Sequence, residues 1–450
     1  MPPSEAQTLA IMNKRVSSSV NDRTIQRSLI LFWGVFALDA LTVLLASEDR
    51  ISVPVVYHAA WITFSLFALL AWANRGAAAP ELAPTDRFLV FAFLFLTLVA
   101  IITGPLMAQG SNYLAKEAVR QVVPFLGFAL VFSPLASLSG LRRVFRAAAW
   151  QGPVILIVVI VVTYRYPLYI SKDVTRDYSG PHFAATQLSA SCGGLLVGST
   201  PGFPYPVLRL FGYAAPVMIG LVSQTKAIII VFLALNALLA VPVLAAQGAR
   251  ISAEYWKRLC VIIIVGVGLL TALSYVLLKV AQSDSPAGLY LKESYSRITG
   301  GNLEAGTTDF TKISGQEEDL RIAESITILE NLTLAELLLG DGFGNQIYSK
   351  TFGFNANFAH IGPTAMILKG GVLYTAIFMM LIVRSLWKGW LNRGEPVLGA
   401  CFIIVADRLV LFMIHSEIDP GYGSALLWLA VGALLRCGPP QRRTLTPRRS

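Results

Sequence analysis

Charged residues are scarce in this sequence: Asp, Glu, Lys and Arg fill only 14% of its 450 positions, whereas 55% of the positions are hydrophobic. This charge content is far below that of an ordinary soluble domain, so a fold that has water as its only solvent is excluded. The apolar residues fall in runs of about 17 to 25, the length of helix that crosses the hydrocarbon core of a bilayer. Composition therefore predicts an all-α protein, a polytopic membrane helix bundle.

Cysteine is also scarce. The four cysteines, Cys192, Cys260, Cys401 and Cys437, lie within or at the ends of apolar runs and lack the spacing of a metal ligand set. A thiol in such a place usually serves as a small buried hydrophobe. We therefore expect neither a metal nor a cofactor.

A cleavage signal and an internal repeat are missing as well. The first 26 residues are polar, and the apolar run after them has no small-residue cleavage pattern. We therefore expect no signal peptide to be removed. Without a repeat, the inverted symmetry of many secondary transporters has no support in this chain.

Hydropathy predicts about twelve membrane spans, interrupted by one long polar stretch. The spans lie near residues 28–47, 54–74, 87–108, 119–139, 146–163, 184–199, 205–222, 225–246, 258–281, 359–384, 397–414 and 421–436. The chain is thus divided into an N-terminal tail (1–27), nine spans (28–281), a large loop (282–358), three spans (359–436) and a basic tail (437–450).

The basic residues set the predicted orientation. The net charge is +10, but Lys and Arg form short clusters beside apolar runs rather than one patch, which favours a membrane over a nucleic acid as partner. Loops with Arg142 and Arg143, with Lys257 and Arg258, and with the stretch 384–393 fall on one side together with the basic tail. Both termini are therefore predicted to be cytoplasmic, with the loop 282–358 on the opposite face.

The large loop is predicted to have two parts. Residues 283–316 are rich in Gly, Ser, Thr and Asp and predict an irregular, mobile segment. Ser314 and Glu317 then form a capping box at the start of a helical pattern that has Ile322, Ile326 and Leu329 on one face. This pattern predicts an amphipathic helix lying on the membrane surface.

Few ionisable residues interrupt the apolar runs, and such residues are functional candidates because burying a charge in lipid is costly. The candidates are Asp39, Lys226, His360, Lys369, Asp407 and Arg408. Asp407 and Arg408 are expected to neutralise charge inside the bundle, either with each other or with Asp39.

Four features occur in order around the large loop. Gln224-Thr225-Lys226 opens a span, Arg321 lies in the loop helix, Gly340-Asp341-Gly342-Phe343-Gly344 follows, and His360 precedes Gly371 by eleven positions. This arrangement resembles the O-antigen ligase and Wzy-type polymerase family, whose members have about twelve spans and a large external loop before a histidine-bearing helix. The sequence departs from the family pattern at Lys226, where arginine is usual, and at Ile361, where a polar residue is common.

The resemblance implies a bacterial inner-membrane enzyme that transfers a glycan from undecaprenyl diphosphate at the periplasmic face, without a metal. Lys226 and Arg321 would stabilise the departing diphosphate, and His360 would accept the proton of the incoming sugar hydroxyl. Predicted substrate contacts are Gly342, Gly344, Lys369 and Arg297.

Several alternatives stay open at this point. A polymerase would extend a lipid-linked repeat unit, with a chain-length regulator as a possible further partner, whereas a ligase would transfer the glycan to lipid A-core. A transporter or flippase, or a non-catalytic scaffold, would also be a bundle of spans. Individually, Lys226 could anchor a helix at the headgroups, Arg321 could contact lipid phosphate, and His360 could make a structural hydrogen bond. The glycines around Gly342 could simply form a tight turn.

Overall fold

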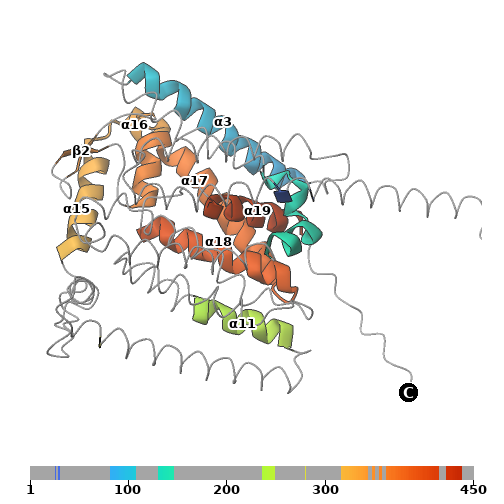
Figure 1. Ribbon diagram of the computed structural model, residues 1–450. Helices are drawn as coiled ribbons and strands as arrows, with labels where there is room; N and C mark the ends of the chain where they lie inside the picture. The colour runs from blue at the N-terminus through green and yellow to red at the C-terminus, as the bar shows by residue number, and fades with distance from the viewer. Residues whose placement is uncertain are drawn as a thin grey trace, which may run out of the picture.

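A computed structural model describes eleven stretches of the chain: residues 26, 29–30, 82–107, 130–145, 236–248, 279, 316–342, 347–349, 354–356, 361–414 and 422–437. Apart from one two-stranded sheet, the described part is helical (Figure 1). Its elements are α3 (Pro84–Met107), η1 (Pro134–Ala136), α11 (Asn236–Gly248), α15 (Gln316–Asn331), α16 (Leu334–Leu339), β1 (Ile347–Ser349), β2 (Phe354–Ala356), α17 (Gly362–Leu391), α18 (Pro396–Ile414) and α19 (Tyr422–Arg436).

Two of the described helices are long and apolar enough to cross a membrane. They are Pro84–Gly104 within α3 and Gly362–Leu391, which is the whole of α17. Helices also stand where the sequence predicts spans at 397–414 and 421–436, as α18 and α19. The predicted helical class is confirmed for this part of the chain, and its two long apolar helices suggest association with a membrane.

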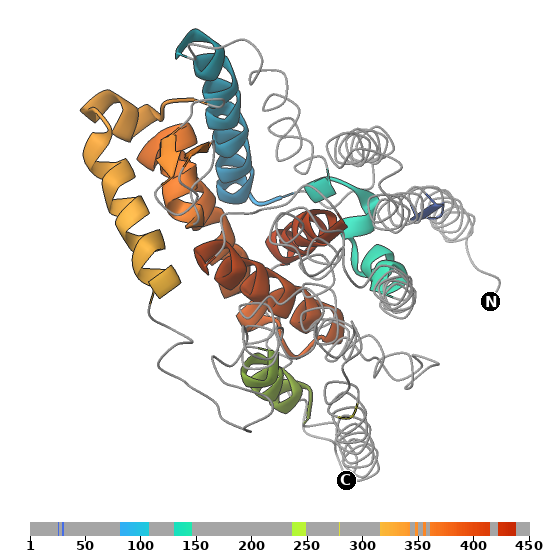
Figure 2. The ribbon, with the colours of Figure 1, turned by 60° about the vertical axis from the view of Figure 1, so that its left-hand side comes forward.

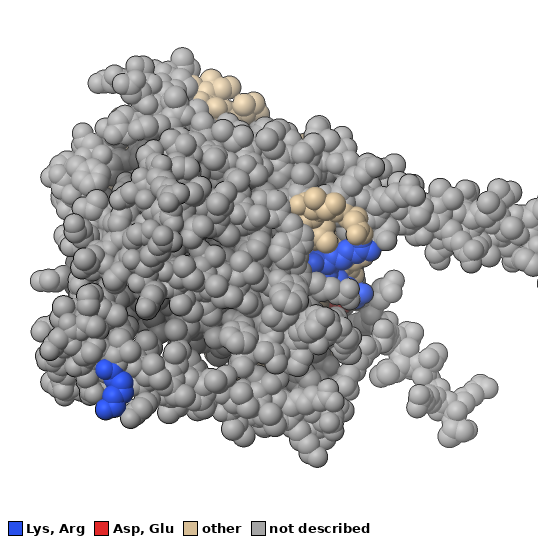
Figure 3. Space-filling view, in the orientation of Figure 1, with Lys and Arg blue, Asp and Glu red and all other residues tan. Residues whose placement is uncertain are grey.

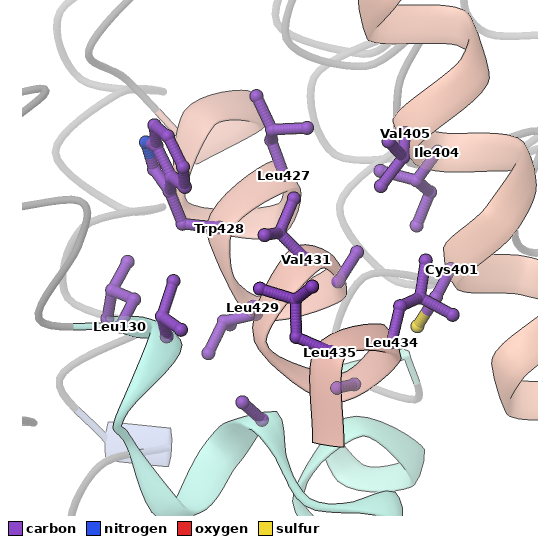
Figure 4. Packing of buried hydrophobic residues seen from close by; sticks show 14 of the residues in the cluster. Leu130, Cys401, Ile404, Val405, Leu427, Trp428, Leu429, Val431, Leu434 and Leu435 are labelled. Carbon is purple, nitrogen blue, oxygen red and sulfur yellow. The ribbon is translucent and has the colours of Figure 1, made fainter. Parts of the chain in front are cut away.

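The core is built around α17 and α19. Phe93 of α3 stacks on Tyr374 of α17 with the ring centroids 4.8 Å apart, and Phe378 and Trp428 surround the same ring. Figure 4 shows the side chains of α19 between Leu130 on one side and the α18 residues Cys401, Ile404 and Val405 on the other. Aromatic side chains of α3, α17 and α19 thus pack against one another in the core.

The predicted span 119–139 ends earlier than expected. The chain is helical at Leu130 and Val131, forms the 3-10 turn η1, and returns to helix at Leu138. Pro134 explains the interruption, because proline has no amide hydrogen and its ring clashes with the preceding helical turn. The buried Ser133 caps the turn by accepting a hydrogen bond from the Leu135 amide at 3.2 Å.

The predicted span 359–384 also differs from the structure. Helix α17 runs on to Leu391, so Arg384 and Lys388 lie on the helix instead of in a loop. In addition, Gly371 has φ 75° and ψ 179°, which breaks α17 into two helical segments. The apolar run predicts the helix but does not reveal this break.

A short β-hairpin lies within the predicted large loop and was not expected. β1 pairs with β2 in antiparallel register, with Tyr348 opposite Asn355. Each strand has only three residues, too few for the alternation by which strands are recognised in a sequence.

Candidate functional site

Helix α15 turns polar side chains toward the protein and apolar side chains outward. Glu324 and Ser325 are buried, with 1% and 7% of their surface exposed, and Arg321 is half-buried. Ile322, Ile326 and Leu329 are exposed, as are three leucines of α16. The predicted apolar face of α15 is therefore a real face, and its exposure is the reverse of the pattern expected for a helix in water.

The inward face of α15 consists of Arg321, Glu324, Ser325 and Ile328. Ile328 packs on Ala365 and Leu368 in the first segment of α17. This contact fixes the inward face against the start of α17, as Figures 1 and 2 show for the two helices. His360 immediately precedes this part of the chain in sequence.

Two polar atoms on the inward face have no hydrogen-bond partner among the described residues. They are Nε of Arg321 and Oγ of Ser325, and both atoms are buried. Residues four apart on a helix are neighbours on its surface, with Cβ atoms about 5–6 Å apart. A buried donor without an acceptor costs about 1–3 kcal/mol, so this face favours a ligand that accepts hydrogen bonds and carries negative charge.

A capping box fixes the start of α16. The Glu336 amide donates to the Thr333 hydroxyl at 3.3 Å, and the Thr333 amide donates to the Glu336 carboxylate at 2.7 Å. The hydrogen bond from the Thr333 backbone, with that from its side chain, lowers the pKa of Glu336 below its ordinary value of 4.5. The ionised carboxylate therefore holds the helix start in place.

Thr333→Ala is expected to weaken α16 by about 1 kcal/mol, because the amide of Glu336 loses its acceptor. Since the folded pKa of Glu336 is lowered, the contribution of its carboxylate is present above the ordinary pKa and is lost as the pH falls through the folded one. Amide hydrogen exchange of residues 334–339 measures both effects. Thr327→Ala, which removes no cap, is the control, and equal exchange in the two variants would contradict the prediction.

A glycine turn closes the break in α17. In a continuous helix the carbonyls of Leu368 and Lys369 would accept from the amides four residues later, but the conformation of Gly371 interrupts that pattern. The amides of Asp341 and Gly342 take their place, donating to Leu368 and Lys369 at 2.8 and 3.1 Å. In an apolar surrounding an unpaired carbonyl would be costly. The amides of residues 341 and 342 therefore supply the hydrogen bonds that α17 lacks at its break.

Glycine is required on both sides of this contact. Gly340 and Gly342 have φ of 81° and 82°, a region that other residues adopt only with strain. A Cβ at Gly342 would collide with the backbone of Gly104 and Thr103 in α3, and one at Gly371 with the backbone of Leu338 in α16. The described contacts of Gly342 are thus packing contacts, and its substrate contact stays a prediction.

A charge cluster occupies the opposite end of the bundle and consists of Asp86, Arg384 and Lys388. The fully buried carboxylate of Asp86 accepts hydrogen bonds from Nε of Arg384 and from Nζ of Lys388, the latter at 2.6 Å. Nζ of Lys388 also donates to the Leu435 carbonyl at 2.6 Å. The cluster joins α3, α17 and α19.

Sequence reasoning missed Asp86. It stands at the start of an apolar run, where an acidic residue usually faces water, so nothing marked it as buried. The available signal was the spacing of Arg384 and Lys388, which places two cations on one helix face. Figure 3 shows a separate group of basic side chains on the described surface, over the segment that carries Arg142 and Arg143. Arg142 there makes a 3.2 Å ion pair with Glu395.

The structure describes only some of the predicted site residues. Arg321, Gly342 and Lys369 are described, and the glycine turn joins the second to the backbone of the third. The other four, Lys226, Arg297, Gly344 and His360, lie outside the described residues. The predicted convergence of Lys226, Arg321 and His360 therefore stays a prediction.

Two other predicted features can be placed. Asp407 and Arg408 of α18 are buried, with 1% and 6% exposed. Each has an interaction partner, while Asp39 lies outside the described residues. Within the described residues, no three His, Cys, Asp or Glu side chains are grouped so that they could hold a metal ion.

Comparison of the sequence with protein-family models and with curated proteins finds no match.

Proposed function

We propose that this protein is a membrane glycosyltransferase of the polysaccharide polymerase type, which transfers a glycan from undecaprenyl diphosphate to a lipid-linked repeat unit. The observation that carries the proposal is the inward face of α15, where a buried guanidinium nitrogen of Arg321 has no acceptor among the described residues. An anionic diphosphate supplies such an acceptor, and a guanidinium suits it because its fork of donors matches phosphate geometry.

The ends of the bundle support an external position for this face. Helices α3 and α17 are antiparallel, because Asp86 at the start of α3 meets Lys388 near the end of α17. Asp86 and Gly104 are eighteen residues apart on α3, which corresponds to about 27 Å and is close to the thickness of the hydrocarbon core. The end with the charge cluster carries basic residues, which supports a cytoplasmic position for that end.

The opposite end then lies at the periplasmic face. Gly342 packs on Gly104 at that end of α3, and α16 and the inward face of α15 pack on the adjacent part of α17. The exposed apolar residues of α15 and α16 fit contact with the outer leaflet, while the polar residues face the protein interior. A lipid-linked donor that stays in the membrane would present its diphosphate at this level.

The proposed reaction is a displacement at the anomeric carbon of the donor. The bond from that carbon to the diphosphate oxygen breaks, and the electron pair leaves with the diphosphate. A hydroxyl oxygen of the acceptor sugar forms the new glycosidic bond, and its proton passes to His360. Arg321 and Lys226 stabilise the negative charge that develops on the leaving diphosphate.

Removing either the base or the guanidinium is expected to reduce elongation strongly. His360→Ala should lower the rate by about 10²–10⁴-fold, and Arg321→Ala by about 10²–10³-fold. Arg321→Lys should keep part of the activity, because the charge remains while the bidentate fork is lost. The measurement uses purified protein, a defined lipid-linked repeat unit and gel separation of longer lipid-linked products.

Arg142→Ala is the matched control, since it removes an exposed cation at the opposite end of the bundle. Elongation at the wild-type rate in both His360→Ala and Arg321→Ala would contradict the proposal. In cells, loss of long chains with single repeats kept on lipid is expected after deletion. If full-length chains instead accumulate on undecaprenyl diphosphate, the protein is a ligase and not a polymerase.

A further inference from the structure

Ser325 differs from four other helical hydroxyls of the described structure. Thr97, Thr327, Thr375 and Ser385 each donate to the carbonyl four residues earlier, at 2.8 to 3.0 Å. This back-bonding is the usual way in which Ser and Thr are satisfied within a helix. Ser325 is buried and makes no such bond, so the donor of its Oγ is left for another acceptor.

The acceptor must lie on the inward face of α15, since that is where Ser325 is buried. Arg321 is one helical turn away on the same face, and its buried Nε is likewise without an acceptor among the described residues. Glu324 also faces inward with 1% exposed, and it has an interaction partner of its own. The Cβ atoms of residues four apart on a helix are about 5–6 Å apart, so the oxygens of one phosphate group can reach both free donors.

We propose that Ser325 is a second ligand-binding residue beside Arg321 and that its hydroxyl donates to a phosphate oxygen of the donor lipid. This inference rests on the proposed function for the identity of the ligand. The ligand class is a polyprenyl diphosphate, whose charged oxygens make stronger acceptors than a neutral carbonyl. Arg321 supplies the charge, and Ser325 fixes the orientation of the phosphate.

The proposal has a signature that separates it from a structural role. A hydroxyl that stabilises the fold lowers the melting temperature when it is removed, whereas removing a buried hydroxyl without a partner is neutral or stabilising. Ser325→Ala is therefore expected to keep or raise the melting temperature of the free protein. At the same time it should weaken the binding of undecaprenyl diphosphate by about 10- to 100-fold, as expected for a lost hydrogen bond to a charged group.

The experiment compares Ser325→Ala, Ser325→Thr and Thr327→Ala in the full-length protein in detergent. Binding of undecaprenyl diphosphate is followed by the ligand-induced rise in melting temperature over a concentration series. Ser325→Thr keeps a hydroxyl and should restore binding. Thr327→Ala removes a hydroxyl that is already bonded to Ala323 on the same helix, and it should bind like the wild type.

Two results would overturn the inference: a lower melting temperature in Ser325→Ala with unchanged binding, or equal loss of binding in Ser325→Ala and Thr327→Ala. The wild type failing to bind undecaprenyl diphosphate would overturn it as well. The proposed function fails separately. If the lipid binds in the expected pattern but purified wild-type protein never elongates a lipid-linked repeat, the binding site stands and the polymerase activity does not.

Discussion

Gly371→Ala is expected to lower the free energy of unfolding by about 2–5 kcal/mol. Two costs combine. The φ of 75° at Gly371 is unfavourable for alanine, and the new Cβ would collide with the backbone of Leu338 in α16. A backbone cannot rotate out of the way as a side chain can, so α16 or the break in α17 must move.

Thermal unfolding in detergent and the yield of monodisperse protein measure this effect. Gly394→Ala is the control, because a Cβ there approaches only the Ala246 carbonyl, at 3.3 Å. That variant is expected to stay within about 1 kcal/mol of the wild type, like most substitutions away from the core. Similar melting temperatures for Gly371→Ala and Gly394→Ala would show that the contact between α16 and α17 is not a tight one.

Asp86→Ala is expected to lower the free energy of unfolding by about 3–5 kcal/mol, because removing one member of a buried ion pair leaves the other without its counter-charge. Here two cations lose the same carboxylate. Lys388 is the more affected, with 16% of its side chain exposed against 38% for Arg384. The amine keeps only its bond to the Leu435 carbonyl, so the joint between α3, α17 and α19 should loosen.

The matched control is again an ion pair, but an exposed one. Arg142 pairs with Glu395 at 3.2 Å while 52% of the arginine side chain is exposed, and such pairs contribute about 0.2–1 kcal/mol. Arg142→Ala should therefore leave the melting temperature almost unchanged in the same assay. A loss in Asp86→Ala no larger than in Arg142→Ala would mean that the cluster is solvated and does not hold the helices together.

The sequence predicts helices well wherever one local signal suffices. The apolar run behind α3 is long enough to identify a helix by length alone, and the runs behind α18 and α19 also predict the helices found there. The periodic isoleucines of α15 likewise identify a helix with one apolar face. These features depend on neighbours a few residues apart, which a reader of the sequence can see directly.

Contacts between distant parts of the chain could not be predicted in this way. The glycine pair at 370–371 does not by itself predict a break in α17. The amides that satisfy the carbonyls at the break lie in the turn at 340–342. Asp86 and Arg384 are 298 positions apart, and a single chain carries no local sign of their pairing. The state of Ser325 could not be predicted either, because only the structure shows that its hydroxyl is buried and makes no hydrogen bond to a carbonyl of its own helix.

The exposed apolar face of α15 is what a helix lying on a membrane surface would present, as the sequence predicts. Periodicity shows that one side of a helix is apolar, but it does not say what lies on that side. In water the apolar side turns inward; here Ile322 and Ile326 are about half exposed while Glu324 is buried. The sequence pattern therefore predicted helix α15 and its apolar face, and the contact of that face with a membrane stays a prediction.

The hydrogen bonds from the amides of residues 341 and 342 to α17 tie together two parts of the chain that are separate in sequence. A chimera with its boundary between 342 and 362 would keep backbone amides and carbonyls on both sides, so the contact would depend on glycine being present at 340, 342 and 371. Residues 334–342 and 362–371 therefore act as one structural unit on either side of the hairpin β1–β2, so a chimera should take both from the same parent.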